Sequence, residues 1–277
     1  ANLVKAGHVV LGFDLVAENL KAARDNGVTV MANAPAAVKD AEVVITMLPA
    51  GKHVLSVYED VAPRAAKGSL FIDCSTIDVE SARKAHATAR NHGHASIDAP
   101  VSGGTGGAAA GTLTFMAGGA DEAFARAEPV LKPMAGRIVH CGGDGAGQAA
   151  KICNNMLLGI SMIGVAEAFV LAEKLGLSHQ ALFDVASTSS GQCWSLTSYC
   201  PVPGPVPASP ANKGYKPGFA AALMLKDLKL SQEAAQAAGA STPLGAEATQ
   251  LYALFNQHGH SGVDFSGIIN FLRGDAA

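Results

Sequence analysis

The strongest constraint on the fold of this chain is a change of pattern halfway along it. Up to about Cys141, short apolar runs alternate with polar stretches that favour helices, and after Gly147 the strand pattern stops. Strands and helices that alternate at this spacing build βαβ units around a parallel sheet. The sequence therefore predicts a doubly wound α/β domain over residues 1–146, followed by an all-helical domain over residues 147–277.

The first half contains six runs that are typical of buried strands. They are His8–Phe13, Glu42–Leu48, Ser69–Asp73, Ala95–Asp98, Leu113–Gly118 and Arg137–His140. Between them we expect helices over Glu18–Asp25, Val79–Asn91 and Asp121–Met134.

The second half opens with Gln148–Leu175, a run without proline and with a single glycine, Gly164. It predicts one helix of about 28 residues, roughly 42 Å long. Because apolar residues occupy most of its circumference, we expect a buried central helix. Further helices are expected over His179–Ser187, Phe219–Ala238, Gly245–Gln257 and Ser266–Leu272, with an irregular proline-rich stretch over Pro201–Lys216.

Composition excludes several classes of function. The net charge is −3 and aromatic residues make up 5% of the chain, so neither a basic field nor a stacking platform favours nucleic acid. No run of 18 uncharged apolar residues predicts a membrane span.

The five cysteines form no C-x-x-C pair, which argues for reduced thiols and against a zinc ribbon. Two His-Gly-His pairs, at His92 and His258, are interpreted as solvated turns, so no metal site is expected.

A doubly wound domain usually binds its nucleotide at a glycine-rich turn after the first strand. The match Gly145-Ala-Gly147-Gln-Ala-Ala150 lacks the required context, because a long helix follows it where a second strand should come. Asp14 instead ends a strand where a ribose-binding carboxylate belongs, and its spacing places the glycine turn before Ala1. Residues Ala1–Ala6 would then be the end of the first helix. The alternative is that Asp14 is a strand-end turn residue.

Four segments carry candidate chemistry. Thr46–Pro49 and Asp73–Thr76 end predicted strands, where ligands of α/β sheets collect. Asp98–Gly111 is glycine-rich and exposes backbone N–H groups that suit a carboxylate, unless it is a flexible loop. The fourth segment, Gln148–Asn155, places polar side chains at the start of an apolar helix.

In that fourth segment, Lys151, Asn154 and Asn155 lie on neighbouring positions of one helix face. Amides inside a buried helix need partners, and a partly buried lysine can exchange protons near neutral pH. An exposed lysine in a first helical turn would be unremarkable, so the residues alone leave its role open.

These segments, in this order, resemble those of the β-hydroxyacid dehydrogenases. The motifs that carry the resemblance are Met47-Leu-Pro49, Asp73-Cys-Ser-Thr-Ile-Asp78, Asp98-Ala-Pro-Val-Ser-Gly-Gly104, Gly147-Gln-Ala-Ala-Lys-Ile-Cys-Asn-Asn155 and Leu225-Lys-Asp-Leu228. The segment from Ser189 to Trp194, with Tyr199 and Pro201–Gly204, is similar to the branch that acts on 3-hydroxyisobutyrate. The resemblance covers nearly the whole chain and implies a Rossmann-type first domain.

The resemblance implies a role for each matching residue. Lys151 would exchange the substrate hydroxyl proton and Asn155 would orient the substrate. Ser102, Gly103 and Gly104 would hold its carboxylate, and Trp194 and Tyr199 would shape the pocket. The positions that match cofactor contacts are Asp14, Leu48, Pro49, His53, Thr76, Phe219 and Lys226. The Asp14 carboxylate would favour NAD, because it repels a 2′-phosphate.

The implied reaction is oxidation of 3-hydroxyisobutyrate to methylmalonate semialdehyde with NAD, a step of valine degradation. Other small β-hydroxyacids or semialdehydes, such as tartronate or succinic semialdehyde, stay open as substrates. A non-catalytic homologue is the alternative from another class. The apolar helix suggests a homodimer or homotetramer. The composition suggests a bacterial cytoplasm, and the expectation that residues precede Ala1 leaves the mitochondrial matrix open.

Lys151→Ala tests the implied role of the lysine. We expect kcat to fall by about a hundredfold or more, because general acid–base catalysis contributes on that scale, while NAD affinity changes little. In the unaltered chain, the rate of oxidation should rise with pH as Lys151 loses its proton. Steady-state kinetics and calorimetric NAD binding measure the two effects, and equal losses in both would contradict the assignment.

Overall fold

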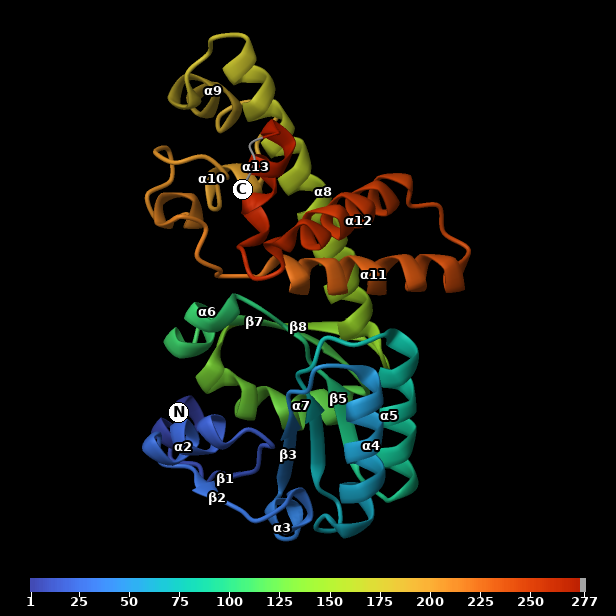
Figure 1. Ribbon diagram of the computed structural model, residues 1–277. Helices are drawn as coiled ribbons and strands as arrows, with labels where there is room; N and C mark the ends of the chain where they lie inside the picture. The colour runs from blue at the N-terminus through green and yellow to red at the C-terminus, as the bar shows by residue number, and fades with distance from the viewer. Residues whose placement is uncertain (275–277) are drawn as a thin grey trace. The chain divides into compact units, whose positions relative to one another are not determined.

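The computed structural model describes residues 1–274 and divides into two compact units (Figure 1). The first unit comprises Ala1–Lys151 and the second begins at Ile152. The boundary lies inside a long helix, α8 (Ala146–Lys174), which supplies residues to both units. The sequence predicts a boundary between residues 146 and 147, near the start of this helix and before the division at Lys151.

The main sheet of the first unit has six strands. β3 (Val43–Thr46), β4 (Leu70–Asp73) and β5 (Ala95–Asp98) pair in parallel, in that order. β7 (Leu113–Gly118) runs antiparallel to β5 and to β6 (Val101–Ser102), and β8 (Ala135–Gly142) is parallel to β7. The sheet is therefore mixed where the sequence predicts a parallel one, because the chain between β5 and β7 forms β6 and the short helix α6 (Gly104–Ala110) and then reverses into β7.

A separate two-stranded sheet consists of β1 (Leu11–Gly12) and β2 (Thr29–Val30), which are parallel. The predicted strand His8–Phe13 is thus shorter than expected, since β1 has a ladder partner on one side only. Within residues 1–274, β3 pairs on one side as well; its Ile45 is 37% exposed, and Met47, which directly follows the strand, is 65% exposed. Apolar side chains around β1 are also exposed, among them Val9 and Leu15.

Helices pack on two faces of the main sheet. Phe71 of β4 points toward a cluster that includes Val54 and Tyr58, whereas Leu70 and Ile72 point toward a second cluster that includes Leu131. This alternation is the period-two pattern of a strand buried on both faces. The helices of this unit are α1 (Asn2–Lys5), α2 (Ala17–Asp25), α3 (Ala34–Val38), α4 (Gly51–Val61), α5 (Val79–Asn91), α6 (Gly104–Ala110) and α7 (Asp121–Leu131).

The second unit is helical, as predicted, and packs around one core. That core joins Phe169 of α8 to Met224, Tyr252 and Ile268, which lie on three later helices. Besides α8, the helices are α9 (His179–Ala186), α10 (Trp194–Thr197), α11 (Ala221–Ala238), α12 (Pro243–Phe255) and α13 (Ile268–Arg273), with short 3₁₀ or π segments at Pro210–Lys213, Asn256–His260 and Phe265–Gly267.

Helix α8 is less enclosed than the sequence predicts. Leu157 and Leu171 are 63% and 59% exposed. By length and composition alone, the helix is also apolar enough to cross a membrane. Because the core helix of a globular protein meets the same criterion, this composition carries no membrane assignment.

Two glycines of α8 make a matched test of its packing. A Cβ on Gly147 would collide with the Met116 carbonyl and lie 2.7 Å from that of Asp98, while a Cβ on Gly164 would meet nothing within 4 Å. We expect Gly147→Ala to destabilise the protein by about 2 kcal/mol or more, because backbone must move. Gly164→Ala should stabilise it by about 0.5–1 kcal/mol through helix propensity.

Urea denaturation of both variants measures these free energies of unfolding. Equal effects of the two substitutions would show that the first turn of α8 is not tightly packed against the sheet.

Candidate active site

Hydrogen bonds connect the first turn of α8 to the carboxyl ends of two strands. The Asp98 carboxylate, at the end of β5, accepts hydrogen bonds from the backbone N–H groups of Gly145 (2.9 Å) and Gln148 (2.8 Å). The Gln148 side chain donates to the Ser75 carbonyl at 2.7 Å and accepts from the Ile77 N–H at 3.1 Å, both just after β4. Gln148 and Asp98 are almost fully buried.

These bonds explain why the glycine motif at Gly145–Ala150 is not a nucleotide fingerprint. A phosphate at a helix N-terminus needs free N–H groups, and here the Asp98 carboxylate already accepts from two of them. Gly147 permits close contact between α8 and the sheet backbone. Among the described residues, no further sheet strand follows α8, which agrees with the prediction made from context.

Lys151 lies one turn further along α8 and is 7% exposed. Its Nζ donates to the Val101 carbonyl at 2.8 Å. Val101 directly precedes Ser102, which pairs with Thr114 in the sheet. The amine and the predicted carboxylate loop are therefore neighbours within the first unit.

The glycine-rich segment after Ser102 is more ordered than a loop. Gly103 and Gly104 have φ angles of +128° and +61°, which favour glycine, and α6 begins at Gly104. The sequence did not predict α6, since its composition, GTGGAAA, has low helix propensity. Both glycines are exposed at the start of the helix. The pairing of β6 with β7 ends at Ser102, before the two glycines.

The predicted cofactor residues Leu48, Pro49 and Thr76 lie at the carboxyl ends of β3 and β4. A buried network holds this edge. Asp73 Oδ1 accepts from Thr46 Oγ1 at 2.7 Å and from Ser75 Oγ at 2.6 Å. Ser75 Oγ in turn accepts from the Leu48 N–H at 2.8 Å.

Burial raises the pKa of Asp73, and the bonds from Thr46 and Ser75 make its carboxyl group part of the framework. The polar groups of this network bond to one another, and the predicted cofactor residues Leu48, Pro49 and Thr76 lie beside them at the edge of the sheet. His53 is exposed in the first turn of α4.

Asp14 follows β1 and is partly exposed. Its carboxylate accepts from the Val16 N–H at 2.8 Å and from the Asn19 side chain at 3.1 Å. It therefore shapes the turn into α2, as the alternative interpretation states. A carboxylate has further acceptor positions, so this role is compatible with ribose binding. The segment between β1 and α2 contains no glycine-rich turn in this chain.

In the second unit, Asn155 is 2% exposed and is held by two neighbours. Its Nδ2 donates to Asp227 Oδ2 at 2.6 Å, and its Oδ1 accepts from Asn154 Nδ2 at 3.0 Å. These bonds fix which way the Asn155 amide faces. Lys226 Nζ lies 3.7 Å from Asp227 Oδ1. Lys226 was predicted from its motif and Asp227 was not, although a buried amide signals that such a partner exists.

Aromatic rings join the predicted pocket residues into one stack. Trp194 stacks on Tyr199 with ring centroids 5.0 Å apart, Tyr199 stacks on Phe265 at 5.3 Å, and Phe219 meets the edge of Phe265 at 5.7 Å. Residues predicted separately for substrate and cofactor are thus connected through Phe265, which carries no motif in the sequence.

Asp264 anchors this stack and is fully buried. Its Oδ2 accepts from the Tyr199 hydroxyl (2.9 Å) and from the N–H groups of Gly218 (2.9 Å) and Phe219 (3.1 Å). Burial and the nearby Asp264 charge raise the pKa of Tyr199, so its hydroxyl remains a donor. The other carboxylate oxygen, Asp264 Oδ1, accepts from the backbone N–H and the hydroxyl of Ser266.

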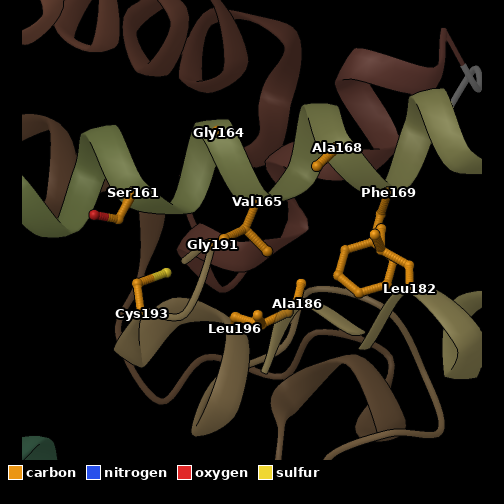
Figure 2. A pocket seen from close by; sticks show the side chains of 10 residues that line it. All are labelled: Ser161, Gly164, Val165, Ala168, Phe169, Leu182, Ala186, Gly191, Cys193 and Leu196. Carbon is orange, nitrogen blue, oxygen red and sulfur yellow. The ribbon is translucent and has the colours of Figure 1, made fainter. Parts of the chain in front are cut away.

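A separate groove lies along α8 in the second unit (Figure 2). It has a volume of about 320 Å³ and is lined mainly by apolar side chains of α8, α9 and α10, with Ser161 and Cys193 at one end. None of the predicted site residues lines it.

The cysteines and histidines differ in how well they were predicted. All five cysteines are free thiols, as expected. In residues 1–274, no three metal-ligating side chains gather. The interpretation of His94 as a solvated turn residue was wrong: it is 7% exposed, donates to the Ala62 carbonyl and contacts Phe71. His94 directly precedes β5, and this position places its side chain in the core.

Both units match family models. Residues 1–143 match a model described as the NAD binding domain of 6-phosphogluconate dehydrogenase. Residues 145–272 match one described as the NAD-binding domain of NADP-dependent 3-hydroxyisobutyrate dehydrogenase.

Relatives match over nearly the whole chain. A probable 3-hydroxyisobutyrate dehydrogenase of Mycobacterium tuberculosis is 56% identical over 100% of this chain and 94% of its own length. An NAD-dependent L-serine dehydrogenase of Pseudomonas aeruginosa is 49% identical, over 96% of this chain and 90% of its own. The solved structure of M. tuberculosis 3-hydroxyisobutyrate dehydrogenase with L-serine has a TM-score of 0.96 at 56% identity, covering 98% of this chain and 93% of that one.

The fold, a doubly wound unit and a helical unit that share one long helix, and the matches above identify the class as nicotinamide-dependent β-hydroxyacid dehydrogenases. The cofactor of this class is a nicotinamide dinucleotide. With the matches above, the chain belongs to the 3-hydroxyisobutyrate dehydrogenase family.

Asp264→Asn tests the anchoring of the aromatic stack. An asparagine Nδ2 cannot accept the bonds that Asp264 accepts, so we expect a loss of about 1–3 kcal/mol in unfolding free energy. Trp194 is the only tryptophan, and its fluorescence should shift as Tyr199 moves. Asp184→Asn, an exposed carboxylate on α9, is the control. An unchanged spectrum in Asp264→Asn would show that the stack does not depend on this carboxylate.

Proposed function

We propose that this chain oxidises 3-hydroxyisobutyrate to methylmalonate semialdehyde with NAD. The observation that carries the proposal is the 2.8 Å bond from Lys151 Nζ to the Val101 carbonyl. It fixes an amine beside Ser102, Gly103 and Gly104, whose hydroxyl and N–H groups suit a carboxylate. A β-hydroxyacid carries its hydroxyl and carboxylate a few bonds apart and can contact both groups together.

In the proposed mechanism, the Ser102–Gly104 segment binds the substrate carboxylate and Asn155 orients the substrate. Lys151 is neutral before the reaction and accepts the proton of the substrate hydroxyl at Nζ. The dinucleotide supplies the hydride acceptor when it is bound. In the reverse direction, protonated Lys151 returns the proton to the carbonyl oxygen. The protein contributes alignment, because the lysine and the carboxylate loop are fixed to one sheet.

Cofactor contacts are proposed for Asp14, Leu48, Pro49, His53 and Thr76 in the first unit. In the second unit, Phe219 and Lys226 are proposed. NAD is favoured over NADP because a carboxylate at Asp14 repels a 2′-phosphate. The name of the P. aeruginosa relative, which specifies NAD, supports this choice for a similar chain.

L-serine is the second candidate substrate, since one relative is named for it and another is solved with it. It shares the carboxylate and primary hydroxyl of 3-hydroxyisobutyrate and carries an ammonium group where the latter carries a methyl. We favour the methyl compound because the proposed pocket residues Trp194 and Tyr199 form an apolar stack.

The oligomeric state and the cellular compartment of the protein are also proposals. Exposed leucines on α8, Leu157 and Leu171 among them, support association into a homodimer or homotetramer. The bacterial relatives above support a cytoplasmic enzyme.

The test is an assay of dinucleotide reduction by the purified chain. With NAD, we expect kcat/KM for 3-hydroxyisobutyrate to exceed that for L-serine by roughly tenfold or more, the scale on which an apolar pocket discriminates. NADP should support a much lower rate. Higher kcat/KM for L-serine would overturn the substrate assignment, and no reduction with any small β-hydroxyacid would overturn the function.

A further inference from the structure

His86 of α5 and Asp98 of β5 form a buried pair at the N-terminus of α8, the helix that carries Lys151. His86 Nε2 lies 2.9 Å from Asp98 Oδ1, and both side chains are about 3% exposed or less. Ser96 Oγ lies 2.7 Å from His86 Nδ1. The motifs that carry the family resemblance include Asp98 but not His86, and neither residue has a role in the proposed mechanism.

Hydrogen-bond chemistry fixes the direction of these bonds. The Asp98 carboxylate already accepts from two backbone N–H groups of the α8 first turn, so it is the acceptor toward His86 as well. The imidazole therefore carries a hydrogen on Nε2. Nδ1 lies within hydrogen-bond distance of the Ser96 hydroxyl. Every polar atom of the imidazole has a partner in this arrangement.

Asp98 controls both determinants of the Lys151 position. Its carboxylate caps α8, the helix that carries Lys151. Its backbone ends β5 and leads through Pro100 to Val101, whose carbonyl accepts from Lys151 Nζ. A shift of the Asp98 side chain would move the helix relative to the acceptor of its lysine.

The same face of α5 also holds the segment that leads into α8. Arg90 donates twice to the Asp144 carboxylate at 3.1 Å, and Arg83 Nε donates to the Asp144 carbonyl at 3.3 Å. Asp144 Oδ1 lies 3.5 Å from His86 Nδ1. Arg83, His86 and Arg90 are three and four residues apart, so they line one face of the helix. His86 is the buried member of this row.

We propose that His86 is a positioning residue for Lys151: its Nε2–H orients the Asp98 carboxylate that caps α8 and so fixes the lysine beside the carboxylate loop. This inference rests on the proposed function for its catalytic consequence. Its structural part, the link from His86 to the first turn of α8, stands on the contacts alone.

Two substitutions at position 86 separate the hydrogen bond from the volume. The amide nitrogen of a glutamine can reach the place of Nε2, so His86→Gln keeps a donor to Asp98. The amide of an asparagine reaches only the place of Nδ1, so His86→Asn loses that donor. His94 offers a matched control, because it is a second buried histidine of the first unit whose Nε2 bonds to a backbone carbonyl away from α8.

We expect His86→Asn to lower kcat by roughly tenfold to a hundredfold, the cost of a small misplacement of a catalytic group, with NAD affinity unchanged. His86→Gln should keep kcat within about threefold of the parent protein. His94→Asn should lose thermal stability and keep kcat. A merely structural role of His86 would instead make kcat follow thermal stability in all three variants, and that outcome would overturn the proposal.

Two further measurements do not need turnover. Amide hydrogen exchange at Gly145 and Gln148 should accelerate in His86→Asn and stay slow in His86→Gln. Acylation of Lys151 by an N-hydroxysuccinimide ester, followed by mass spectrometry, should be several times faster in His86→Asn because the amine is released from its buried site. Unchanged exchange and acylation in His86→Asn would overturn the positioning role. An inactive parent protein would refute the proposed function, while these two readouts would still decide the positioning role.

Discussion

The rest of the structure depends on the carboxylate of Asp98 at the N-terminus of α8. A helix of 29 residues presents unpaired N–H groups and a positive dipole end at its start. Here that end is buried against a sheet, where unpaired donors are costly. Asp98 accepts from two of those N–H groups, and Gln148 adds two bonds to the segment after β4. The first turn of α8 is therefore held by the ends of two strands.

Buried aspartates hold several parts of the candidate site in place. Four of the predicted functional segments contact or adjoin a buried aspartate: Asp73 lies next to the segment of Leu48, Asp98 next to the turn before Lys151, Asp227 next to Asn155, and Asp264 next to Tyr199 and Phe219. All four aspartates are 3% exposed or less. A buried carboxylate is unfavourable unless donors surround it, so each one demands a fixed arrangement of its neighbours. Such an arrangement is what a site that aligns two reactants requires.

Sequence patterns predicted those elements whose signals are local. The strands Ala95–Asp98 and Leu113–Gly118 and the helix Val79–Asn91 agree with the structure to the residue. Helix α4 was missed although Val54, Tyr58 and Val61 repeat at helical spacing. Helix α6 gave no such signal, because its glycines and alanines have no apolar period. The antiparallel direction of β7 was also beyond the sequence, since an apolar run has no preferred direction.

The sequence by itself determined the class of fold, the change from α/β to helical structure, and the residue types of the site, because periodicity and motif order are properties of the chain. Only the tertiary structure decided which groups hold those residues. The partners of Asn155 and Tyr199 come from 72 and 65 residues away along the chain, and the acceptor of Lys151 from 50 residues away. Hydrogen bonds between such distant segments form only when the sheet and the helices have packed. The identity of the buried aspartates as anchors therefore became visible only in the folded chain.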